Sequence, residues 1–142
     1  MKTVGVAGRI AAVAPANEKV TYMATFLVHI HSGPENPTKA ALGFLVALTA
    51  AKAGHTVNLF LAGDGASLIG DQALSTVEGK GTGELGKHFS GLVETGARFY
   101  VSGMSAKARG ITDEDLEKKP AEFAMPDVLV RLAAEADVTL TY

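Results

Sequence analysis

The sequence predicts an α/β fold, a three-layer α/β/α sandwich around a mostly parallel sheet of four to five strands. Short apolar runs of strand length alternate with helical segments, and this alternation requires crossover connections between parallel strands. Glycine is abundant (16 of 142 residues) whereas aromatic residues are few (6%), a composition that suits close packing of helices on a sheet. The amino-acid pattern therefore favours a layered fold over a β-sandwich.

The first half of the chain is predicted to contain two strands and two helices. The expected elements are a strand over 21–30, a helix over 37–53, a strand over 55–62 and a helix over 66–77. The first strand is apolar on both faces, as in a central strand covered by helices on each side. Asn36 suits the N-cap of the following helix, Pro37 its first position and Gly54 its end.

The second half continues the alternation. The expected elements are a helix over 83–95, a strand over 97–101, a helix over 126–136 and a strand over 137–142 at a sheet edge. Ser105 is expected to be the N-cap of a short helix after the third strand. Thr112, followed three residues later by Asp115, predicts a second short helix with a capping box, which Pro120 ends.

Composition limits the function classes. We expect one domain over 21–142, preceded by an N-terminal arm over 1–20. The arm has features of a signal peptide, but Arg9 interrupts its apolar run, so a cytoplasmic protein is expected. A net charge of −2 spread along the chain argues against nucleic acid or membrane partners. The absence of cysteine excludes disulfides, thiolate nucleophiles and thiolate metal sites.

A ligand site is predicted where the strands end. In open parallel sheets, ligands bind in the crevice at the carboxyl ends of the strands, which here are the loops 31–38, 63–67 and 102–109. Hydroxyls, free backbone N–H groups and the Arg109 guanidinium suit a small polar or anionic ligand. The predicted ligand-binding residues are His31, Ser32, Gly33, Asn36, Asp64, Gly65, Ser102, Gly103, Met104, Ser105 and Arg109. No cofactor and no catalytic residue are predicted.

Other patterns leave alternatives open. If the strand continues through both residues, His29 and His31 share one face of it and, with Asp64, could hold zinc, although a histidine that caps a strand end is commoner. Ser102 or Ser105 could be a nucleophile activated by a histidine, but the spacing shows no base. Lys107 and Arg109 could instead pair with Asp113 and Glu114 at the surface. His55 and His88 are expected to be surface residues, and the glycine-rich stretch 81–87 a flexible connection between helices.

Three motifs resemble one known family. They are NPTKAALGFLVALTAAKAGH, NLFLAGDG and, above all, VSGMSAKARG, within a similarity that spans about residues 22–142. The chain resembles the DsrE/DsrF-like family and its YchN-like branch. This resemblance implies a parallel, flavodoxin-like α/β/α sandwich, assembly as trimers or hexamers, and sulfur relay through a persulfide on a loop cysteine. Ser102 and Ser105 stand where that branch has cysteines, while Ala108, Arg109 and Gly110 keep the pattern. A serine hydroxyl carries no stable persulfide, so sulfur transfer is not expected here.

The expected function is therefore that of a cysteine-less DsrE-like protein. It is expected to form a homo-oligomer, a trimer or hexamer, and to bind a small polar molecule or anion. The helix over 37–53 supports assembly because its polar face holds only Lys39, Thr49 and Lys52, which leaves apolar surface for another subunit to cover. Two alternatives stay open: an enzyme that uses a serine or a histidine-bound metal, and an assembly protein whose site is vestigial.

Overall fold

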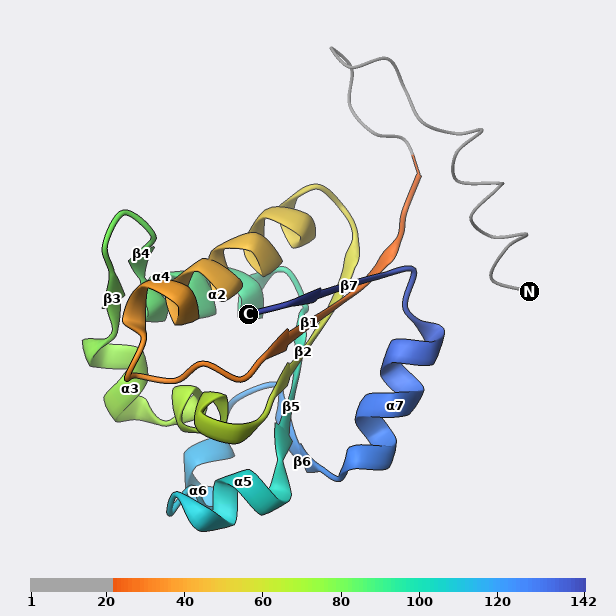
Figure 1. Cartoon of the computed structure of the whole chain (residues 1–142). Coiled ribbons are helices and arrows are strands. Elements are labelled where there is room, and N and C mark those ends of the chain that lie inside the picture. The colour runs from red at the N-terminus through yellow and green to blue at the C-terminus, as the bar shows by residue number, and fades with distance from the viewer. Residues whose placement is uncertain (1–21) are drawn as a thin grey trace.

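A five-stranded parallel sheet forms the centre of the computed structural model, which describes residues 22–142 (Figure 1). The strands are β1 (Thr25–Ile30), β2 (Thr56–Leu61), β5 (Arg98–Ser102), β6 (Ala121–Ala124) and β7 (Val138–Thr141). Their order across the sheet is β6-β5-β2-β1-β7, and every neighbouring pair is parallel. The predicted fold class is confirmed, and β7 lies at the edge as expected. The predicted arm over 1–20 falls outside the described residues.

Helices cover both faces of the sheet. On one face lie α2 (Pro37–Lys52), α3 (Asp71–Thr76) and α4 (Leu85–Glu94), whereas α7 (Pro126–Glu135) lies on the other (Figure 1). Three short helices gather near the carboxyl ends of the strands: η1 (Gly63–Ile69), α5 (Gly103–Ala108) and α6 (Asp113–Leu116). Within residues 22–142, no helix has the length and apolar content needed to cross a lipid bilayer.

Alternation along the strands divides the core into two parts. Val28, Leu59 and Phe99 point toward α2 and α4 and are fully buried there. Leu27 and Phe60 point the other way and pack against Leu132 and Ala136 at α7 or its end. Burial of each such side chain stabilises the fold by about 1.5–3 kcal/mol. Because helices cover both faces of the sheet, both faces of β1 and β2 carry apolar side chains.

Two local predictions were wrong, and one strand was missed. The expected helix over 66–77 is broken at Gly70, whose extended backbone (ψ 149°) separates η1 from α3. The connection predicted as flexible contains a small antiparallel ribbon, β3 (Glu78–Gly79) paired with β4 (Gly83–Glu84), and α4 begins only at Leu85. Strand β6 was not predicted, because its four residues AEFA show no pronounced strand preference.

Candidate functional site

The three predicted loops meet at the carboxyl end of the sheet. The backbone N–H of Gly63 donates to Ser105 Oγ at 2.8 Å, which ties the loop after β2 to the one after β5. Gly33 and Asp64 approach so closely that a Cβ on Gly33 would lie 2.2 Å from the Asp64 carbonyl oxygen. A third close contact joins Gly65 to the backbone of Ile30 at the end of β1. The predicted residues thus belong to one rim of the molecule.

The Arg109 guanidinium binds a carboxylate of the same chain. Its Nη2 and Nε donate to Asp64 Oδ1 at 2.8 and 3.3 Å, and its Nη1 donates to the Ser105 carbonyl oxygen at 3.1 Å. The alternative pairing of Arg109 with Asp113 or Glu114 was therefore wrong, because the fold brings a partner from 45 residues away. The ion pair neutralises much of the positive charge, but two of the five guanidinium N–H donors stay available.

Both serines of the third loop accept hydrogen bonds from the backbone. Ser102 Oγ accepts from the Ser105 N–H at 3.3 Å, so Ser102, and not Ser105, is the N-cap of α5. Ser105 Oγ accepts from Gly63. Neither hydroxyl is hydrogen-bonded to a histidine within residues 22–142, and a nucleophilic serine needs a base at hydrogen-bond distance. The geometry gives these serines structural roles.

His29 and His31 are brought together as predicted. Their ring centroids lie 5.5 Å apart with the planes inclined by 71°. Burial, followed by the charge of neighbouring His31, lowers the pKa of His29 below its ordinary value. Asp64, the suggested third ligand, binds Arg109 instead, and the described part of the chain holds no group of three metal-ligating side chains.

The other predicted residues lie around this rim in differing environments. Asn36 caps α2 as expected, its Oδ1 accepting from the Lys39 N–H at 3.2 Å, and Ser32 is buried. Gly103 borders a separate hollow beside β6, and the Met104 side chain is 63% exposed.

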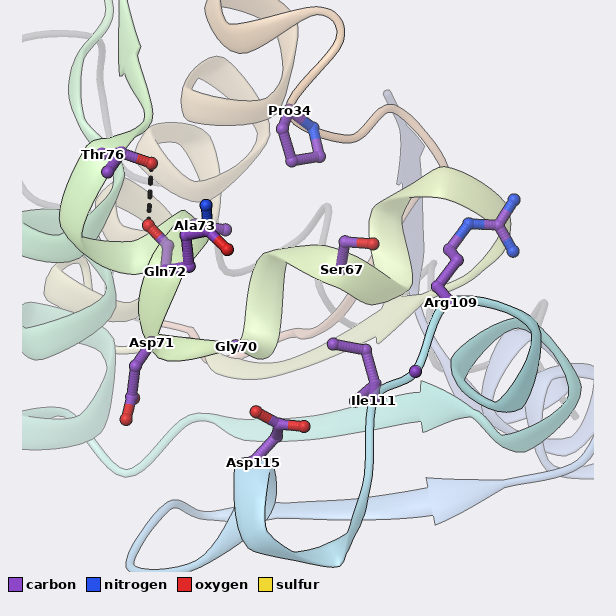
Figure 2. Close-up of a pocket in the computed structure, with 11 residues that line it drawn as sticks. Pro34, Ser67, Gly70, Asp71, Gln72, Ala73, Thr76, Arg109, Ile111 and Asp115 are labelled. Atoms are coloured by element: carbon purple, nitrogen blue, oxygen red, sulfur yellow. Dashed lines mark hydrogen bonds between the residues drawn. The ribbon is translucent and has the colours of Figure 1, made fainter.

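A cavity of about 490 Å³ lies beside the predicted loops and runs along η1 (Figure 2). Its lining comprises Pro34, Ser67, Gly70, Asp71, Gln72, Ala73, Thr76, Arg109, Gly110, Ile111 and Asp115. Arg109 alone among these belongs to the predicted site, and in Figure 2 its guanidinium points away from the centre of the cavity. The chain turns at Gly70 between η1 and α3, and this turn helps to form the cavity. Because the segment was predicted to be one continuous helix, the lining residues around the turn were not predicted.

Lys119 holds one side of this cavity together. Its Nζ donates to the carbonyl oxygens of Ile69 and Asp115 at 2.8 and 2.6 Å and forms an ion pair with Asp71 at 2.8 Å. The hydrogen bond and the charge of Lys119 lower the pKa of Asp71. The contacts of Lys119 could not be predicted from the sequence, because all three depend on tertiary structure or on the turn after α6.

Comparisons with known proteins agree with this geometry. The structure is similar to that of the ychN protein from E. coli, with a TM-score of 0.68 and 17% sequence identity over 85% of this chain and 100% of that one. At this identity the likeness establishes the fold alone. A comparison with curated proteins finds no match. The family model described as "DsrE/DsrF-like family" matches residues 24–142, which include every residue of the predicted site. The chain therefore belongs to the DsrE/DsrF-like family.

Proposed function

We propose that this chain is a homo-oligomeric member of its family that binds a small polar molecule and does not transfer sulfur. The observation that carries the proposal is the joining of three strand-end loops by the Ser105–Gly63 hydrogen bond and the Arg109–Asp64 ion pair, next to a cavity of about 490 Å³. Pre-formed cavities at the carboxyl ends of parallel strands are the usual ligand sites of such sheets.

The absence of a thiol supports the second half of the proposal. Persulfide relay needs a cysteine sulfur, and the 142 residues contain none. Ser102 and Ser105 use their oxygens to hold α5 and the loop after β2, so the rim keeps its shape without a reactive sulfur. A ligand held there by hydrogen bonds is the function that this rim can still perform.

The outer surface of α2 supports assembly. Leu42, Leu45 and Val46 remain only half-buried in the single chain, on a helix with few polar residues. Met104 and Met125 are exposed near the carboxyl ends of β5 and β6. Apolar surface of this kind is typical of contacts between subunits, so we propose a trimer or hexamer.

Native mass spectrometry of gently purified protein tests assembly and ligand binding together. We expect a homo-oligomer that retains a small molecule. The Arg109→Ala variant should lose that molecule and keep the subunit number, whereas Lys107→Ala, two residues earlier in α5, should keep both. A wild-type monomer with nothing bound would contradict the proposal, and an Arg109→Ala variant that dissociates would favour a purely assembly role.

A further inference from the structure

The four histidines of the chain fall into two pairs that differ in their hydrogen bonding. His55 Nδ1 accepts from the Ala24 N–H at 3.0 Å, and His88 Nε2 lies 2.7 Å from the Thr82 carbonyl oxygen. The ring nitrogens of His29 and His31 have no hydrogen-bond partner among residues 22–142. Two adjacent imidazoles therefore keep their nitrogens available on the same rim as the proposed ligand site.

The spacing of these rings matches two ligands of one metal ion. Two imidazoles bound to a tetrahedral ion at about 2.0–2.1 Å from each nitrogen have centroids about 5.2 Å apart. Neighbouring positions of a square-planar ion would bring the centroids to about 4.5 Å. The observed 5.5 Å lies nearer the tetrahedral value, and His31 directly follows β1, two residues after His29, which places the two side chains on one side of the chain.

The surroundings hold both residues in place. The His29 ring packs edge-on against Phe60 with the centroids 6.0 Å apart, and the ring is half-buried. The His31 side chain is exposed, but its backbone N–H donates to the Tyr142 carbonyl oxygen at 2.9 Å, which fixes the chain at this point. The nearby Arg109 charge is compensated by Asp64, so it opposes a bound cation only weakly.

We propose that His29 and His31 form a binding site for a divalent transition-metal ion that prefers tetrahedral coordination, such as zinc. Within residues 22–142, no carboxylate, histidine or cysteine joins this pair as a third ligand. Two coordination positions are therefore left for water or for an oxygen or nitrogen of a small molecule. Such a site exchanges its ion more readily than a closed four-ligand site. The inference does not depend on the proposed function.

Zinc titration of the full-length chain without an affinity tag tests the site. After treatment with a chelator, isothermal titration calorimetry should show saturable binding of a single zinc ion per chain. Loss of an outer-shell group around a metal already costs about 10- to 100-fold, so His29→Gln and His31→Gln should each weaken binding at least about tenfold. The matched variant His88→Gln should bind zinc like the wild type.

Two further measurements keep the test independent of variant folding. Cobalt(II) bound to the wild type should give the intense visible absorption of a tetrahedral ion, and zinc should shift the imidazole NMR signals of His29 and His31 but not those of His55. The absence of saturable binding would overturn the proposal. So would unchanged zinc affinity in the His29→Gln/His31→Gln double variant, or a weak, octahedral cobalt spectrum.

Discussion

Gly65 provides the sharpest test of how the rim is built, because a methyl group there has no room. A Cβ on Gly65 would lie 2.3 Å from the Ile30 carbonyl oxygen and 3.2 Å from the His31 Cα, both of them backbone atoms. Real Cβ atoms essentially never approach closer than 3.0 Å, so η1 and the end of β1 must separate by at least 0.7 Å. The same Ile30 oxygen accepts the Ala62 N–H at 3.0 Å, and this hydrogen bond would stretch as well.

The expected cost of Gly65→Ala follows from these two effects. Overpacking typically costs about 1–3 kcal/mol, and loss of a buried backbone hydrogen bond about 1–3 kcal/mol more. Because part of the strain relaxes, we expect the free energy of unfolding to fall by about 3 kcal/mol and Tm by about 10 °C. Urea denaturation followed by circular dichroism measures the first quantity and thermal denaturation the second.

Gly70→Ala is the matched control. Gly70 has φ −73° and its nearest atoms would lie 3.5 Å from an added Cβ, which is ordinary contact. Alanine there restricts the unfolded chain, so the stability should stay equal or rise by up to about 1 kcal/mol. If Gly65→Ala and Gly70→Ala unfolded at the same urea concentration, the argument from close backbone contact would be refuted.

Four other predictions concern charged and titratable groups. Asp64→Asn should lower the stability by only about 0.5 kcal/mol, less in high salt, because its ion pair with Arg109 is partly exposed; urea denaturation at two salt concentrations measures this. Lys118 has φ 63°, so Lys118→Gly should raise the free energy of unfolding by about 0.5–1 kcal/mol in urea titration. Lys119→Met should lower Tm, because two carbonyl oxygens lose their donor at a cost of about 1–3 kcal/mol each. The lowered pKa of His29 means that the unfolded state binds a proton at this residue more tightly than the folded state does. The free energy of unfolding should therefore fall as the pH drops below about 6.5. The His29→Gln variant should lose part of this pH dependence in urea titrations from pH 8 to pH 5.

Local sequence signals predicted the starts of helices well, because such signals act over few residues. The Asn36–Pro37 start of α2 and the Thr112–Asp115 capping box both appear as expected. The helix cap after β5 was placed three residues too late, because Ser102 and Ser105 are both good caps and only the end of the strand decides between them. Strand β6 was missed because its pairing with β5, and not its own residues, makes it a strand.

The site was predicted less completely because its contacts join distant segments. Strand-end loops could be located from the topology of parallel sheets, and their convergence followed. The partner of Arg109 could not be predicted, since Asp64 lies 45 residues away while Asp113 and Glu114 lie close in sequence. The hydrogen bonds of His55 and His88 could not be predicted for the same reason, because they form only when the chain is folded.

The placement of β7 beside β1 has a consequence for how the molecule reaches its native state. Phe26 pairs with Val138, and the Thr25 N–H donates to an Asp137 carboxylate oxygen 112 residues further on. Closing a loop of that length carries a large entropic cost before any contact rewards it, which slows folding. During synthesis, the edge of β1 that pairs with β7 stays unpaired until nearly all described residues have left the ribosome. This unpaired edge can pair wrongly with another strand in the nascent chain.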